Sequence, residues 1–164
     1  MDPILYKEEQ GVRRNGLWFI LLITPAIIIT LLLYQRFSGK VIFDNTLDDI
    51  PLAIITVSYL IPAVFSLSRI KLVTIIDAEK ISYGWNIPSD DLNEIPLADI
   101  QAGSIVEYKF VGYGFRRTHK YGMIYNVIGN KGLQIIKKSG GKVLIGTNNV
   151  EELQKVIKSL GLSA

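Results

Sequence analysis

The chain has 164 residues, enough for one or two small domains, and 49% of them are hydrophobic. Its formal net charge is only +3, with 18 basic residues interspersed among 15 acidic ones, which argues against a nucleic-acid-binding protein. The absence of cysteine excludes a disulfide framework, a cysteine-ligated metal and thiol chemistry.

Two apolar runs near the start raise the mean hydropathy to +0.30 and predict membrane spans. Residues 17–34 read LWFILLITPAIIITLLLY and residues 50–68 read IPLAIITVSYLIPAVFSLS, and neither run contains a charged residue. Eighteen helical residues extend about 27 Å, close to the ~30 Å hydrocarbon core of a bilayer. The polar segment 35–49 is therefore expected to be a short external loop between two transmembrane helices.

A signal peptide and a buried core helix are the alternatives for the first run. Two acidic residues precede it, Glu8 and Glu9, and a second run follows almost at once, which is unlike a signal peptide. Neither run shows the polar stripe of an amphipathic helix. Both observations favour the two-helix hairpin.

The flanking charges predict its orientation. The N-terminal tail 1–16 contains Lys7, Arg13 and Arg14, and the second run is followed by Arg69 and Lys71. By the positive-inside rule, both termini lie in the cytoplasm, and the protein is a multi-pass protein of the cell (inner) membrane. The runs contain no Asp, Glu, Lys, Arg or His, which argues against a proton relay or an ion path.

From residue 69 onward the apolar period becomes two, which is typical of half-buried strands. Asn149 followed by Glu152 forms a capping box, and apolar residues at helical spacing after it predict a closing amphipathic helix. Such a helix is able to cover one open end of a bent sheet. Seven short strands are expected, over 71–76, 81–85, 95–100, 104–110, 123–128, 133–138 and 142–146.

The segment GYGFRRTHKYG, residues 112–122, is the candidate functional site. It lacks the third glycine of a dinucleotide-binding loop, and a strand rather than a helix follows it. A platform that stacks single-stranded nucleic acid is an alternative, but aromatic residues alternating along a strand usually pair across strands. The favoured interpretation is a long hairpin with solvated basic side chains. A sharper alternative is a contact surface for acidic lipid headgroups or an acidic partner, formed by Arg116, Arg117, His119 and Lys120.

Several stretches of residues 69–164 resemble the bacterial pleckstrin-homology-like domains. They are IDAEKISYGW, IPLADIQ, GYGFRRTHKYGMIYNVIGNKGLQI and KVLIGTNNVEELQKVI. The resemblance implies a bent seven-stranded antiparallel sheet, or partial barrel, capped by a C-terminal helix, with a binding rather than a catalytic role. One feature departs from it: the first strand connection, residues 77–80, is short and largely acidic, unlike the basic loop of phosphoinositide-binding members.

The residues indicate no enzyme. His119 has no carboxylate at a suitable spacing, and Asp90 with Asp91 lacks the further ligands of a metal site. No catalytic residue, cofactor or metal is expected. The expected fold class is an α+β membrane protein with a pleckstrin-homology-like domain over 69–164.

The expected function is a non-enzymatic, membrane-anchored binding or scaffolding module for a protein partner or a second copy of the chain. The alternatives are a sensor of anionic lipid headgroups and an accessory subunit of a membrane transporter or enzyme. Nucleic acid is not an expected partner.

Overall fold

The structure is a computed structural model of the chain, and it describes residues 3–11, 17–40, 49–86, 91–109 and 114–162. The chain divides into two compact units, a helical unit, Arg13–Arg69, and a β unit formed by Met1–Val12 together with Ile70–Ala164. The helical unit is therefore an insertion in the sequence of the β unit.

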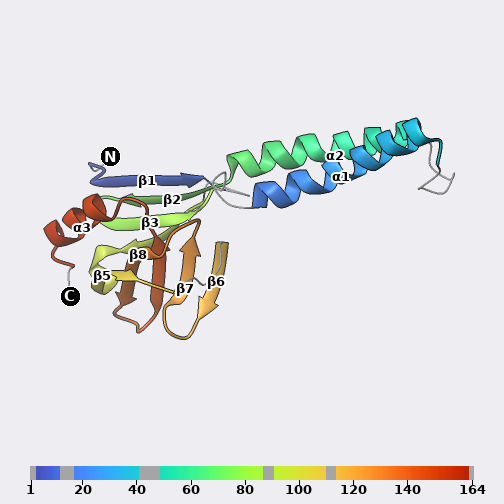
Figure 1. The fold of residues 1–164 in the computed structure, drawn as a ribbon. Helices are drawn as coiled ribbons and strands as arrows, with labels where there is room; N and C mark the ends of the chain where they lie inside the picture. Colours follow the sequence, from blue (N-terminus) through green and yellow to red (C-terminus); the bar gives the residue numbers. More distant parts are fainter. Residues whose placement is uncertain (1–2, 12–16, 41–48, 87–90, 110–113, 163–164) are drawn as a thin grey trace. The chain divides into compact units, whose positions relative to one another are not determined.

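The helical unit consists of α1 (Leu17–Ser38) and α2 (Asp49–Arg69), which pack against each other (Figure 1). Leu32 of α1 and Thr56 of α2 are buried. Many large apolar side chains on both helices are exposed, such as Ile23 and Ile61. The predicted loop 35–49 is helical at both ends, and its central part, 41–48, lies outside the described residues.

The prediction of two transmembrane helices is corrected by the structure. Among the residues it describes, no helix is both long and apolar enough to cross a membrane. The predicted inner-membrane location, with both termini in the cytoplasm, is corrected together with the transmembrane helices.

The β unit contains two sheets joined by the short 3-10 helix η2 (Leu97–Asp99) (Figure 1). The first sheet is antiparallel, in the order β1-β2-β3-β4, with β1 (Tyr6–Gly11), β2 (Lys71–Ile76), β3 (Lys80–Trp85) and β4 (Asn93–Pro96). The second has the order β5-β8-β9-β7-β6, with β5 (Ile100–Glu107), β6 (Gly114–Thr118), β7 (Gly122–Asn126), β8 (Lys131–Lys137) and β9 (Lys142–Gly146). Its β7–β9 pair is parallel and its other pairs are antiparallel. The last element is α3 (Val150–Ser159).

The hydrophobic core is shared by both sheets and α3. Alternate residues of β2 and β3, such as Leu72 and Ile81, belong to the same buried cluster as Ile135 and Ile145 of the second sheet. The helix α3 contributes Leu153 and Ile157 to this cluster. Other buried side chains of the sheets that belong to it include Ile76, Tyr83, Ile95, Leu133 and Val143. Burying one such aliphatic side chain contributes about 1.5–3 kcal/mol, so this cluster holds the two sheets together.

The N-terminal strand β1 is tied to the connection between β9 and α3. The Glu8 carboxylate accepts hydrogen bonds from the Thr147 hydroxyl at 2.7 Å and from the backbone N–H of Asn148 at 2.8 Å. The Gln10 side-chain amide donates to the carbonyl oxygen of Gly146 at 2.7 Å. Hydrogen bonds between residues far apart in the sequence therefore hold the N-terminal strand to the rest of the β unit.

The predicted fold, a single bent seven-stranded sheet, is wrong. The described residues form nine strands in two sheets. The two strands that were not predicted are β1, in the segment expected to be a tail, and β6, in the segment expected to be a loop. Both are rich in charged residues or glycine, YKEEQG and GFRRT, so neither shows a run of alternating apolar residues.

Candidate functional site

A cavity of about 830 Å³ lies at one end of the second sheet. Its lining comes from the β6–β7 hairpin, within residues 117–123, and from the β8–β9 hairpin, within residues 137–143. The strand β9 begins at this cavity and ends at the opposite end of the sheet, where the chain continues into α3. The site therefore lies away from the start of that helix.

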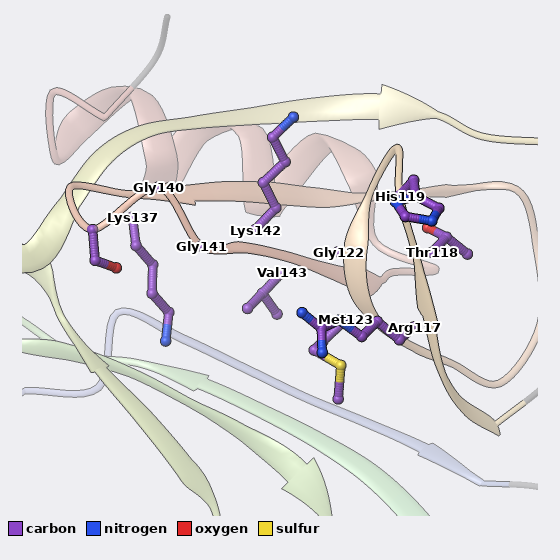
Figure 2. Close-up of a pocket in the computed structure, with 11 residues that line it drawn as sticks. Arg117, Thr118, His119, Gly122, Met123, Lys137, Gly140, Gly141, Lys142 and Val143 are labelled. Atoms are coloured by element: carbon purple, nitrogen blue, oxygen red, sulfur yellow. The ribbon is translucent and has the colours of Figure 1, made fainter.

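The strand register decides where the cationic side chains of the cavity lie. Across neighbouring strands, Arg117 is paired with Met123, and Met123 is paired with Val143. Val143 is also paired with Ile135 of β8, and Lys137 lies two residues after Ile135. Because strand side chains alternate between faces, these four lie on one face of the sheet. Lys142 precedes Val143 and lies on the other face, as Figure 2 shows. Basic side chains therefore approach the cavity from both faces.

Two turns shape the backbone around the cavity. In the β8–β9 turn, the Gly140 N–H donates to the Lys137 carbonyl at 2.8 Å, and the Lys137 N–H donates to the Gly141 carbonyl at 2.8 Å. Gly140 has φ +85°, a conformation that glycine adopts without steric cost. Ser139, which belongs to this tight turn, also lines the cavity.

The approach of β7 to β9 at the cavity also requires glycine. Gly122 has φ +75°, and a Cβ atom there would lie 2.0 Å from the carbonyl oxygen of Lys142. No side chain is compatible with that distance unless the two strands separate. Gly122 therefore sets how closely the two hairpins meet at the cavity.

The charge around the cavity has one sign. Its lining contains Arg117, Lys137, Lys142 and His119, and no carboxylate. The ion pairs found in the described part of the chain all lie on the first sheet, where Glu9 binds Lys7 and Lys71, and Glu94 binds Lys80. None of them involves a cavity residue, so the lining has a positive potential that no neighbouring described carboxylate neutralises.

The sequence contains a signal for this charge that the small net charge of the whole chain hides. Between Glu107 and Glu151 there is no acidic residue. The same interval contains eight basic residues besides His119: Lys109, Arg116, Arg117, Lys120, Lys131, Lys137, Lys138 and Lys142. Averaged over residues 69–164, this excess is hidden, because that segment has 13 basic and 9 acidic residues. Counting charges over a shorter stretch of the sequence would have indicated that the β8–β9 turn, as well as β6, belongs to the basic site.

The structure separates the four predicted site residues. Arg117 and His119 line the cavity. Arg116 is paired with Ile124 and lies on the other face of β6. The Lys120 ammonium lies 4.9 Å from the centre of the Tyr121 ring and does not line the cavity. The favoured hairpin interpretation agrees with the β6–β7 pairing, and Lys137, Ser139 and Lys142 are added to the site by the other hairpin.

No metal centre is formed by the residues that the structure describes, since they contain no group of three His, Cys, Asp or Glu side chains arranged to hold an ion. Asp90, one of the acidic pair considered from the sequence, lies outside the described residues. That the chain is not an enzyme and needs no cofactor stays a prediction.

Comparison with known proteins identifies no family. No protein-family model matches the chain, and no curated protein is significantly similar to it. Together with the two-sheet architecture, this corrects the resemblance to the bacterial pleckstrin-homology-like domains. Where the structure describes them, the short stretches behind that resemblance are strands, turns and a helix, which many β-rich folds share.

Proposed function

We propose that the β unit is a non-enzymatic binding module for a small organic anion that carries a phosphate or carboxylate group. The ligand binds in the cavity between the β6–β7 and β8–β9 hairpins. The observation that carries this proposal is the charge of the lining, which has three Lys or Arg side chains, no carboxylate, and no ion pair to the described remainder of the chain. Membrane anchorage is not part of the proposal.

The chemistry of the lining suits such a ligand. The Arg117 guanidinium presents a planar fork of N–H donors, which matches the oxygen pairs of phosphate and carboxylate groups. Lys137 and Lys142 supply compact charges, and the Ser139 hydroxyl supplies a neutral donor. Hydrogen bonds to charged groups contribute about 1.5–3 kcal/mol each, so a few of them support binding in the micromolar to millimolar range.

The apolar part of the lining selects among anions. Met123 and Val143 lie on the same face as Arg117 and Lys137 (Figure 2). A free inorganic anion leaves these side chains uncovered, whereas an organic anion buries apolar surface on them at about 25 cal/mol per Å². We therefore expect a phosphate ester or a larger carboxylate to bind more tightly than inorganic phosphate.

The test is a calorimetric titration of the full chain with inorganic phosphate, citrate and phenyl phosphate at low salt. Lys137→Ala is expected to weaken binding about tenfold or more, because one charge-assisted hydrogen bond is lost. The matched control is Lys131→Ala, which removes the same charge from the exposed start of the same strand, about 20 Å away.

The control distinguishes a built site from general attraction. If both variants weaken binding equally, the anions respond to net charge alone and the proposed site is wrong. The same conclusion follows if the polycation spermidine binds as tightly as the anions. Raising the salt concentration is expected to weaken binding to the unsubstituted chain, since exposed charges are screened.

A further inference from the structure

The β unit has four edge strands, and one of them presents an open edge. In the two sheets the edges are β1, β4, β5 and β6. Among the described strands, β6 pairs with β7 only. Its other edge is therefore available to an additional strand (Figure 1).

The other three edges are covered or blunted. The strand β1 is tied to residues 146–148 by Glu8 and Gln10. At β5, the Gly103 N–H donates to the carbonyl of Leu162, just beyond α3, at 2.7 Å. The strand β4 has only four residues and ends in Pro96, which has no N–H to donate. Such protection is the usual way in which proteins prevent unwanted strand pairing. For β6 the described residues provide no covering segment and no proline, and the strand has only the charges of Arg116 and Arg117.

The open edge carries an exposed aromatic ring at a fixed position. Phe115, the second residue of β6, is 55% exposed. Its ring centre lies 5.0 Å from that of Tyr125, which is itself 5.1 Å from that of Tyr83 in the core. One side of the Phe115 ring is thus held against the sheet, and the rest of the ring offers apolar surface to an added strand.

Charge decides which occupant fits this edge. The strand β6 contains Arg116 and Arg117, and His119 and Lys120 follow it in an interval without acidic residues. Pairing of β6 with β6 of a second copy would bring two arginines from each copy together, which is unfavourable. A segment with acidic side chains instead gains an attractive interaction at each arginine.

We propose that the free edge of β6 binds an extended acidic segment of a partner protein, which adds to the second sheet as a further strand. Backbone hydrogen bonds along five residues, about 17 Å, supply affinity. An apolar side chain of the segment covers Phe115 on one face of the sheet, and the acidic side chains, on the other face, pair with Arg116. This surface is separate from the anion cavity except for Arg117, which borders both.

The test measures binding of a fluorescent eight-residue peptide that alternates glutamate and valine to the full chain, by fluorescence anisotropy. Two peptides serve as controls, one with lysine in place of glutamate and one with N-methylated amides on one edge, which keeps the charge but removes backbone donors. The acidic peptide is expected to bind, and both controls are expected to bind at least tenfold more weakly.

Two variants assign the binding to the edge. Phe115→Thr introduces a β-branched residue that suits an exposed strand position, and it is expected to weaken peptide binding about fivefold or more, since it removes the aromatic contact. Lys155→Ala, on α3 and outside both proposed sites, is expected to leave peptide affinity unchanged within twofold. The anion cavity is tested with small anions and Lys137→Ala, whereas the edge is tested with the peptide and Phe115→Thr. Each proposal can therefore fail without the other.

Three results would overturn the proposal. Equal binding of the N-methylated peptide would show attraction by charge without strand addition. An unchanged affinity in Phe115→Thr would place the peptide elsewhere. Self-association of the full chain that is lost in Phe115→Thr, without peptide binding, would assign the edge to a second copy of the chain.

Discussion

At the scale of single residues, two glycines in the turns at the cavity allow backbone strain to be distinguished from a steric clash. Gly122 and Gly140 have similar dihedral angles, with φ +75° and +85°. A Cβ atom at Gly122 would meet the Lys142 carbonyl oxygen at 2.0 Å, whereas a Cβ atom at Gly140 would meet nothing within 4 Å. Alanine at Gly140 therefore reports backbone strain alone, and alanine at Gly122 reports strain together with a steric clash.

We predict that Gly140→Ala lowers the free energy of unfolding by about 1–2 kcal/mol, the cost of a left-handed conformation for a residue with a side chain. Gly122→Ala is expected to lower the free energy of unfolding by more than this, because β7 and β9 must also move apart to admit the side chain. Urea denaturation of the two variants side by side measures the difference. Equal losses would mean that the close strand approach at the cavity contributes nothing to stability.

At the scale of elements, strand β1 depends on charge for part of its attachment. Glu9 of β1 accepts hydrogen bonds from Lys71 of β2, at 2.8 Å, and contacts Lys7 at 2.9 Å. Hydrogen bonds from Lys71 and Lys7, together with their charges, lower the pKa of Glu9 from 4.5 to about 2. The carboxylate is exposed, so its contribution to stability is modest and sensitive to salt.

This pKa predicts a direction for the pH dependence. The unfolded chain takes up the proton near pH 4.5, while the folded chain resists it until about pH 2. The stabilisation by Glu9 is thus complete above about pH 5 and is lost as the pH falls toward 2.

The measurement is the thermal unfolding midpoint at pH 7 and pH 3. Between these two values, Glu9→Gln is expected to lose less stability than the unsubstituted chain. The control is Glu79→Gln, an exposed glutamate that makes no ion pair with the described residues. A pH response that is the same in all three proteins would show that Glu9 does not contribute to the attachment of β1.

At the scale of the whole molecule, a helical unit is inserted between two paired strands. The last residue of β1, Gly11, is the register partner of the first residue of β2, Lys71. Antiparallel strands that end opposite each other are closed by a two-residue turn. The β unit therefore does not need the 57 residues Arg13–Arg69 to bring β1 and β2 together.

We predict that a variant in which residues 12–70 are replaced by an Asn-Gly turn still folds. The loop that must be closed becomes much shorter, which lowers the entropy cost of pairing β1 with β2. A cooperative urea transition and dispersed amide signals in the NMR spectrum are the expected results. A variant that stays unfolded, although its strands carry the full core, would show that the helical unit is needed for the β unit to form.

Local pattern was sufficient for the elements with strong periodicity. The alternation in KLVTII and KVLIG predicted β2 and β9 at the observed residues, and the helical spacing after Asn149 predicted α3 to within a residue. The predicted capping box is not formed, since the Asn149 side chain makes no capping hydrogen bond to the helix backbone. The two apolar runs were predicted to be helices and are helices, but the inference that they cross a membrane was wrong. Periodicity identifies an element and its apolar face, and it does not identify what lies against that face.

What the sequence by itself determined is therefore a helical segment, a β-rich segment and a basic stretch near residue 117. Only the tertiary structure decided that β1 joins the first sheet and that two hairpins, about 20 residues apart in the chain, share one cavity. The physical reason is that sheet pairing and register are nonlocal. A strand such as YKEEQG gains its place from partners like Thr147 and Asn148, and Lys137 meets Arg117 only through the pairing of β8, β9, β7 and β6.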